Sequence, residues 1–263
     1  MTPLLYEKQR EEIEYFVSKI ERQKQKQKLN KFTNFKITFT LSSPICITTP
    51  WLNFDSLIGH LMTMESLDRE YFVTDKKINL AKYMSGGGLP YGSLWHEEEG
   101  LAVPTVSVGY SEEPFEPRVE VLYKRFEGYH ASFKGKIRVG SGHFRNFMIR
   151  HIYIPIKKVT FFVKGDREFI YNLLKRNLFA LGNDVRVGYG FIKNMSVRDM
   201  VKDYSIVMNG KAMRPLPVEF CESYEEVAPL PYKPPYWEKR NVRMCVPPFT
   251  RCELKEKWGR YYG

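Results

Sequence analysis

The chain has 263 residues, 43% of them hydrophobic and 15% aromatic, so it is long enough to bury a large core. Its 41 lysines and arginines exceed its 30 acidic residues, giving a net charge of +11. No apolar run reaches the roughly 18 residues of a membrane-spanning helix, and the amino terminus lacks a secretory signal. We therefore expect a cytoplasmic protein without membrane contact and with four reduced cysteines.

The amino-terminal part predicts a helix followed by a strand. Residues 5–28 carry a narrow apolar stripe among charged side chains, so residues 1–32 are interpreted as a helical extension. Residues 35–48 open with the alternation Phe-Lys-Ile-Thr-Phe-Thr-Leu, which is typical of a half-buried strand.

A second helix is expected over residues 53–65, with Asn53 as its cap. His60 lies inside this helix, and we interpret it as a partly buried histidine because the sequence fixes no acid–base partner near it. Patterning weakens over residues 68–117, where a glycine-rich stretch lacks the Lys-Ser/Thr of a phosphate-binding P-loop.

Positive charge is concentrated between Lys124 and Lys158, where nine basic residues accompany one acid, Glu127. Aromatic and histidine side chains are interleaved with them, so cations can meet phosphates while flat rings stack on bases. This pattern favours a nucleic-acid surface over a merely solvated basic loop. A strand over residues 118–126 precedes the segment, and its glycines indicate a thumb-like insertion at about 127–150.

Residues 157–194 predict a strand, a helix, a glycine-rich loop and a further strand. The strand covers residues 157–164, and the helix covers 166–181 with Asp166 as its cap and Gly182 at its end. The following loop suits phosphate contact, because bare backbone N–H groups approach closely there. Its candidate residues are Arg186, Gly188, Tyr189 and Gly190. A tight entry into the strand over 186–194, without a ligand, is the alternative for the glycines.

Beyond residue 208 the sequence becomes rich in proline and large aromatic residues. We expect residues 208–263 to wrap around the body as an extended tail rather than to form a new domain. The alternative is a ligand for a proline-binding module.

The predicted order is strand, helix, two strands, helix, strand, which is an α+β, ferredoxin-like (RRM-like) arrangement over residues 33–207. Combined with Gly182-Asn-Asp-Val-Arg-Val-Gly-Tyr-Gly-Phe191, it resembles the RAMP superfamily of CRISPR proteins. The segments Arg214-Pro-Leu-Pro-Val and Tyr232-Lys-Pro-Pro-Tyr-Trp237 are similar to the 5′-handle-capping subunit of type IV effector complexes.

This resemblance implies a non-catalytic RNA-binding subunit that caps the 5′ handle of a CRISPR RNA, without cofactor or metal. It also implies backbone subunits and a large subunit as partners, and target double-stranded DNA near its recognition motif as a further candidate. The implied RNA-binding residues are Arg186, Gly188, Tyr189, Gly190, Lys134, Lys136, Arg138, Arg145, Lys124 and Arg125. The implied partner-contacting residues are Tyr129, Phe133, His143 and Phe144.

Three alternatives stay open. Some members of the superfamily are metal-independent endoribonucleases that mature the guide, and the candidate bases here are His60, His130, His143 and His151, with Lys134 or Lys136 stabilising charge. A zinc site from His143, His151 and the late cysteines is a weaker interpretation, because no short ligand pair exists. A ribosomal or tRNA-associated ferredoxin-like module would share the basic surface.

Overall fold

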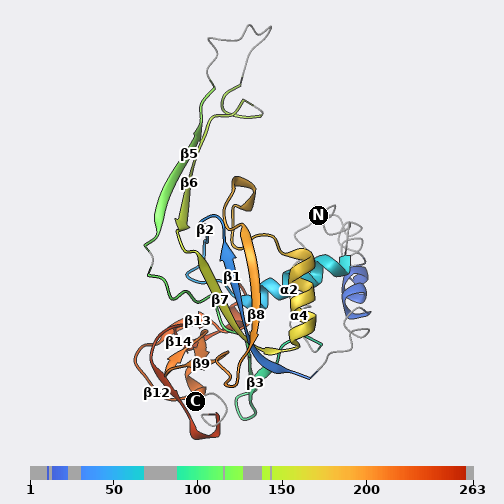
Figure 1. The fold of residues 1–263 in the computed structure, drawn as a ribbon, viewed down its shortest axis with the longest axis vertical. Helices are drawn as coiled ribbons and strands as arrows, with labels where there is room; N and C mark the ends of the chain where they lie inside the picture. The colour runs from blue at the N-terminus through green and yellow to red at the C-terminus, as the bar shows by residue number, and fades with distance from the viewer. Residues whose placement is uncertain are drawn as a thin grey trace.

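The computed structural model describes residues 11, 14–22, 31–67, 88–114, 116–126, 138–142 and 144–258. The fold is α+β, as the sequence predicts. It consists of several small antiparallel sheets, and a two-stranded ribbon projects from the body (Figure 1). Residues 14–22 are helical, in agreement with the expected amino-terminal helix. Among the described helices, none is long and apolar enough to cross a membrane.

The central sheet has three antiparallel strands in the order β7-β1-β8. The strand β1 (Thr33–Leu41) pairs with β7 (Lys158–Gly165) on one side and with β8 (Ile192–Asp199) on the other. Alternate side chains of β1, from Phe35 to Leu41, are buried, which confirms the half-buried strand expected from its alternating sequence.

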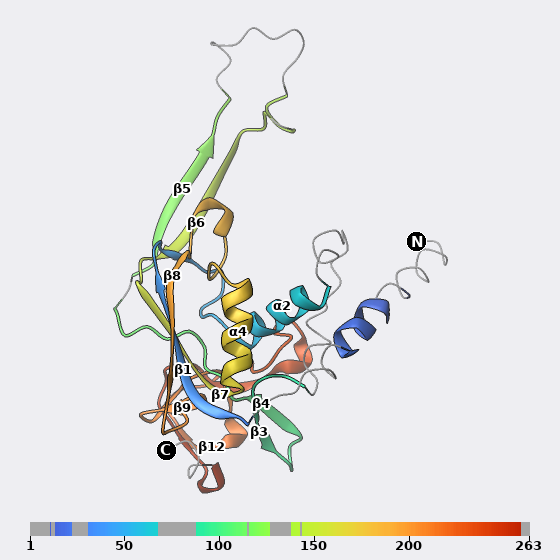
Figure 2. The same ribbon diagram turned by 45° about the vertical axis from the view of Figure 1, so that its right-hand side comes forward.

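Two helices cover one face of this sheet (Figure 2). The helix α2 (Phe54–Leu67) buries Phe54, Ile58 and Leu61, while α4 (Arg167–Asn177) buries Ile170, Leu173 and Leu174. The expected cap of α4 is confirmed, because the Asp166 carboxylate accepts a hydrogen bond from the Phe169 N–H at 2.9 Å. The carboxylate of Glu65 on α2 accepts hydrogen bonds from Arg176 and Asn177, which joins the two helices.

The prediction that α4 runs to residue 181 and ends at Gly182 is wrong. The helix ends at Asn177, because the backbone beyond it pairs with the start of the next strand instead. The Leu181 N–H donates to the Gly190 carbonyl at 2.9 Å, and the Ile192 N–H donates to the Phe179 carbonyl at 3.0 Å. These bonds are incompatible with another helical turn. The predicted strand over 186–194 is likewise displaced, since a short 3-10 helix, η3 (Val185–Val187), precedes β8.

The strand predicted over residues 118–126 exists, but it does not belong to the central sheet. It forms β5 (Arg118–Lys124), which pairs with β6 (Phe147–Ile154), and β6 pairs in turn with β2 (Ile45–Cys46). The segment beside β7 is residues 105–110 instead, through the bridges Val106↔Val163 and Tyr110↔Thr160. The projecting ribbon therefore begins at residue 118, earlier than the expected insertion at about 127.

The carboxy-terminal part folds into three small sheets rather than running as an extended tail. Their strands are β9 (Val207–Met208), β10 (Lys211–Ala212), β11 (Leu216–Pro217), β12 (Cys221–Tyr224), β13 (Ala228–Pro231), β14 (Val242–Val246) and β15 (Cys252–Leu254), with short 3-10 turns η4 (Val218–Phe220) and η5 (Lys239–Asn241). In the sheet β11-β14-β13 the prolines lie on the two edge strands, where a missing N–H is tolerated. A hairpin of β3 (Ser93–His96) and β4 (Leu101–Pro104) shares the buried cluster of these sheets.

One buried arginine connects the central layer to the carboxy-terminal sheets. The Arg214 guanidinium donates to the carbonyls of Pro104, Val106 and Tyr232 and lies 3.2 Å from the Asp55 carboxylate on α2. The Tyr236 hydroxyl donates to the same carboxylate at 2.7 Å. A charge buried to this extent is stable only when it is paired and hydrogen-bonded, as it is here.

We expect Asp55→Ala to lower the free energy of unfolding by about 3–5 kcal/mol, because the substitution leaves the buried Arg214 charge without its carboxylate. Denaturant unfolding followed by circular dichroism measures this change. The matched control is Asp199→Ala, which breaks an exposed pair with Arg167 and should cost only about 0–1 kcal/mol. Equal losses in the two variants would contradict a central role for the buried pair.

Candidate nucleic-acid interface

The ribbon of β5 and β6 projects from the body (Figure 1), and it carries most of its charge as exposed cations. Along residues 118–126, 138–142 and 144–154, six exposed basic side chains accompany one acid, Glu120. The six are Arg118, Lys124, Arg125, Arg138, Arg145 and Arg150. Four of them, Lys124, Arg125, Arg138 and Arg145, were predicted as RNA-binding residues, and the structure places all four on this arm. An exposed arm with one sign of charge suits a polyanion.

The two faces of the ribbon differ. Residues directly opposite each other on paired strands share a face, so Val119, Val121 and Tyr123 lie with Ile152, Arg150 and Met148. All six are exposed, and the exposed fractions reach 78% for Tyr123 and 65% for Met148. The opposite face carries Glu120 and His151 at its base, where it meets the body. Apart from Arg150 the first face is apolar, and the opposite face also exposes Phe147 and Ile149 farther along the ribbon. Apolar side chains left in water in this way are typical of a surface that another molecule covers.

Several predicted residues lie outside the described part of the chain: Lys134, Lys136, Tyr129, Phe133, His130 and His143. Of the expected partner-contacting residues, only Phe144 is described. Its ring packs edge-on against Phe126, with 5.1 Å between ring centroids. Nearby, the Asn146 side chain accepts a hydrogen bond from the Phe126 N–H at 2.7 Å. The segment that follows β5 and the segment that precedes β6 therefore remain connected beyond the paired strands.

The predicted glycine loop, residues 182–191, is closed by backbone hydrogen bonds and held against β2. The Gly190 N–H donates to the Pro44 carbonyl at 2.7 Å, and the Asn183 N–H donates to the Cys46 carbonyl at 2.7 Å. At Gly190, with φ of +71°, a Cβ atom would lie 1.8 Å from the Leu181 carbonyl oxygen. At Gly188 nothing lies within 4 Å of that position. Gly190 therefore serves close packing, whereas Gly188 borders open space.

The two side chains expected to contact RNA from this loop differ in access. Arg186 is exposed on η3. Tyr189 is only 6% exposed, and its ring packs beside His151 and Tyr153. Its hydroxyl donates to the Glu120 carboxylate, and burial together with this carboxylate raises the pKa of Tyr189. In this arrangement the ring fixes the loop to the base of the ribbon and offers no free face for a base to stack on.

Beside Tyr189, three polar side chains converge to form what we call the polar cluster: Cys46, His151 and Asp184. The His151 Nδ1 atom lies 2.8 Å from Asp184 Oδ2, and the Cys46 thiol donates to the same oxygen at 3.3 Å. The hydrogen bonds from His151 and then Cys46 lower the pKa of Asp184. Burial, reinforced by Asp184, raises the pKa of Cys46 to about 11. Sequence reasoning missed Cys46 and Asp184, because the three residues come from separate segments with no recognisable spacing.

The geometry of the polar cluster differs from that of an activated nucleophile. In a cysteine nucleophile site the histidine lies between the thiol and the carboxylate and takes the thiol proton. Here the carboxylate of Asp184 lies between Cys46 and His151. The thiol therefore keeps its proton near neutral pH.

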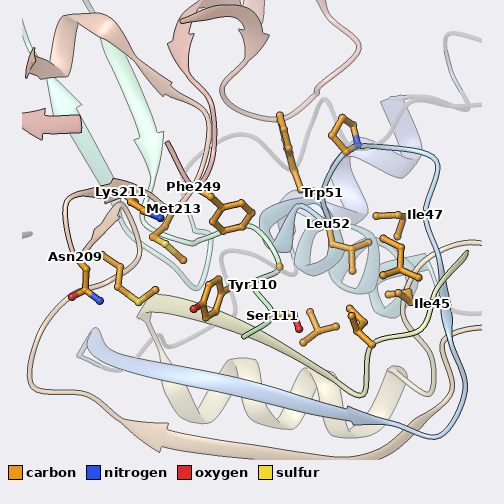
Figure 3. Close-up of a pocket in the computed structure, with 16 residues that line it drawn as sticks. Ile45, Ile47, Trp51, Leu52, Tyr110, Ser111, Asn209, Lys211, Met213 and Phe249 are labelled. Atoms are coloured by element: carbon orange, nitrogen blue, oxygen red, sulfur yellow. The ribbon is translucent and has the colours of Figure 1, made fainter. Parts of the chain in front are cut away.

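A separate cavity of about 460 Å³ opens between β2 and the carboxy-terminal sheets (Figure 3). Its lining is mostly apolar, with Trp51, Tyr110 and Phe249 contributing rings and Lys211 the one cation among the lining residues. None of the predicted RNA-binding residues lines it. The basic ribbon and the glycine loop, rather than this cavity, therefore carry the charge that a phosphate backbone requires.

The sheets and the site together define a small α+β protein with a projecting basic arm. The family described as CRISPR type IV associated protein Csf3 matches residues 116–248, a span that runs from the ribbon through β14, and the chain belongs to this family. No curated protein matches the chain.

Among solved structures, the chain is similar to one in the type III-B Cmr-beta complex bound to cognate target RNA, determined by cryo-electron microscopy. The identity is 16% and the TM-score 0.30, over 71% of this chain and 66% of that one. The chain thus covers just under two thirds of the length of that chain, and so distant a likeness carries no argument about the site.

We expect Gly190→Ala to lower the free energy of unfolding by about 3 kcal/mol or more, because it adds a clash with the Leu181 carbonyl to the strain of a positive φ. Gly188→Ala also has a positive φ but meets open space, so it should cost only about 1–2 kcal/mol. Thermal unfolding of both variants measures the difference. A Gly190→Ala protein as stable as Gly188→Ala would show that the close approach can relax.

Proposed function

We propose that this chain is an RNA-binding subunit of a type IV CRISPR ribonucleoprotein, in which it caps the 5′ handle of the CRISPR RNA and contacts backbone subunits. The observation that carries the proposal is the basic ribbon, whose base is joined to the glycine loop. Membership of a CRISPR type IV associated family supports the setting. A large subunit and target double-stranded DNA are further proposed partners.

The ribbon and the loop are joined at the base of the ribbon. Tyr189 and Asp184 of the loop contact Glu120 and His151 at the base of the ribbon, so exposed Arg186 lies on a segment fixed to that base. Arginine suits phosphate recognition because its planar guanidinium donates two parallel hydrogen bonds. Gly188 adds a backbone position without a side chain above it. We assign phosphate contacts to Arg186 and to the exposed cations of the ribbon.

The apolar face of the ribbon supports a protein partner. An isolated two-stranded ribbon is marginally stable in water. This one leaves Val121, Tyr123 and Met148 exposed on one face. Association with a neighbouring subunit would bury that face, while the cations along the arm remain available to the guide. The ribbon thereby takes the role that the sequence assigned to a thumb-like insertion.

We further propose that residues 33–199 form a ferredoxin-like unit whose second strand is residues 105–110. In chain order the segments are β1, α2, residues 105–110, β7, α4 and β8, which is the β-α-β-β-α-β order. The ribbon is then an insertion between the second and third of its strands.

We propose a binding rather than a catalytic role. His60 lies on the exposed surface of α2, on another element than the ribbon. His151 is 4% exposed, with Nδ1 occupied by Asp184. His151 therefore lacks the open position beside a 2′-hydroxyl that a general base in an RNA-cleaving site needs, and His60 lies apart from the ribbon to which we assign the RNA. The endoribonuclease alternative is tested by the same binding experiment.

We expect Arg186→Ala to weaken binding of labelled CRISPR-repeat RNA and to reduce the salt dependence of log K by about 0.7–1, the loss of one phosphate contact. Fluorescence anisotropy over a series of KCl concentrations, without added metal, measures both quantities. Arg243→Ala on β14 is the matched control, because it removes an exposed arginine far along the chain from the ribbon. The same slope for Arg186→Ala and the wild type would remove Arg186 from the interface.

The same samples run on a denaturing gel test the alternative. Intact RNA at saturating protein agrees with a capping subunit. Site-specific cleavage that is lost in His151→Ala or His60→Ala would make the protein a guide-processing endoribonuclease.

We expect the double variant Tyr123→Ser, Met148→Ser to abolish co-purification with the other subunits while leaving repeat-RNA affinity within about twofold, since neither side chain is charged. Both residues are exposed, so the fold should persist. Replacing exposed Tyr224 and Met244 on the carboxy-terminal sheets is the control. Assembly at full stoichiometry in the ribbon variant would contradict a subunit contact on this face.

A further inference from the structure

The polar cluster brings together a thiol, an imidazole and a carboxylate that the RNA-binding role does not use. One ligand atom from each residue, Cys46 Sγ, His151 Nδ1 and Asp184 Oδ2, lies within 4.8 Å of the other two. Among the described residues, no other group of three such side chains converges in this way. The three come from β2, β6 and the turn before η3, so the fold itself assembles them.

The backbone holds each of these side chains in place. Cys46 and Asn183 form an antiparallel bridge, which puts Asp184 next to β2. Cys46 is paired with Tyr153 on β6, and His151 lies two residues away on the same face of that strand. Asp184 has a φ of +56°, in the left-handed region where aspartate is tolerated but uncommon. Strained backbone of this kind is often retained where it aims a side chain at a site.

His151 has no other polar role in the described part of the chain. Its ring is 4% exposed, its Nδ1 atom faces Asp184, and its Nε2 atom is buried without a hydrogen-bond partner there. The ring is wedged beside Tyr189, with 5.6 Å between the centroids. The one polar contact of this buried imidazole is thus made by Nδ1, the nitrogen that faces the thiol–carboxylate pair and could bind a metal ion.

We propose that Cys46, His151 and Asp184 form a binding site for a first-row transition-metal dication of the zinc type. A thiolate and an imidazole favour such ions over Mg²⁺ and Ca²⁺, which select oxygen ligands. Tetrahedral zinc places its ligand atoms about 3.3–3.8 Å apart, given bond lengths of about 2.0–2.3 Å. The observed separations from Asp184 Oδ2 are 3.3 Å to Cys46 Sγ and 2.8 Å to His151 Nδ1.

Occupancy requires only a small adjustment. A small shift of the Asp184 side chain, which is 41% exposed, would open its two separations to those of a zinc site, and Cys46 and His151, whose ligand atoms lie within 4.8 Å of each other, would close on the ion. Because Asp184 is partly exposed, the fourth ligand position of the metal ion would face solvent, and a water molecule would complete the tetrahedron. On binding, the Cys46 S–H bond breaks and its proton leaves to solvent as the sulfur–metal bond forms. His151 binds as the neutral tautomer with its proton on Nε2.

This site differs from the zinc interpretation raised by the sequence, which combined His151 with His143 and the late cysteines. Cys221, Cys245 and Cys252 lie in the buried cluster of the carboxy-terminal sheets, apart from His151. The proposed ion joins β2, the base of the ribbon and the glycine loop. The proposal stands independently of RNA binding.

The test is equilibrium dialysis of the full chain against Zn²⁺, with the metal content read by mass spectrometry. We expect about one Zn²⁺ per chain, and at least about tenfold weaker binding for Asp184→Asn. Asparagine tolerates the same positive φ, so this variant keeps the fold. Asp199→Asn, which alters an exposed carboxylate elsewhere, is the control and should bind as the wild type does.

Cobalt(II) gives a second readout that identifies the ligands. Binding at this site should produce the thiolate-to-cobalt charge-transfer band in the near-ultraviolet and the visible bands of a tetrahedral ion. Cys46→Ser should remove the first band. No bound zinc at saturating metal, or a cobalt spectrum that Cys46→Ser leaves unchanged, would overturn the proposal and leave a hydrogen-bonded triad only.

Discussion

The buried Arg214 guanidinium is the interaction on which the body of the protein depends. It links α2, the segment beside β7 and the carboxy-terminal sheets through five hydrogen-bond partners contributed by distant parts of the chain. Because a charge this deep is tolerated only when it is paired and hydrogen-bonded, the carboxy-terminal sheets cannot separate from the central layer without exposing or orphaning it.

Under the proposed function the ribbon serves two partners. Val119, Val121, Tyr123, Met148 and Ile152 share one face with Arg150, and further arginines and lysines extend along the arm. The protein partner would then cover apolar side chains of the ribbon, while the guide would contact its cations. The base of the ribbon is fixed to the body by two side-chain contacts, Glu120 with Tyr189 and His151 with Asp184.

Features that depend on local sequence were predictable. The alternation in β1, the helix α2 and the Asp166 cap of α4 are all encoded within about a dozen residues. The end of α4 was not, because Leu181 fits the helical stripe and only its pairing with Gly190 removes it from the helix. The sheet to which β5 belongs, the fold of the proline-rich segment and the polar cluster depend in the same way on contacts between distant segments. Tyr189 shows the same limit for the candidate site. The sequence places it in the glycine loop, but its burial against the base of the ribbon depends on side chains far away in the chain.

The attachment of the ribbon at one end gives it the mechanics of a lever. Seven residues of β5 at about 3.4 Å each reach roughly 24 Å, so a rotation of about 5° at the base displaces the far end of that strand by about 2 Å. The glycine loop supports the base of the ribbon through two of its side chains, Tyr189 and Asp184. A ligand that moves the loop by a small amount would therefore move the far end of the ribbon by a larger amount. Under the proposed function, binding of the guide at the loop would in this way change the position of the surface that contacts the neighbouring subunit.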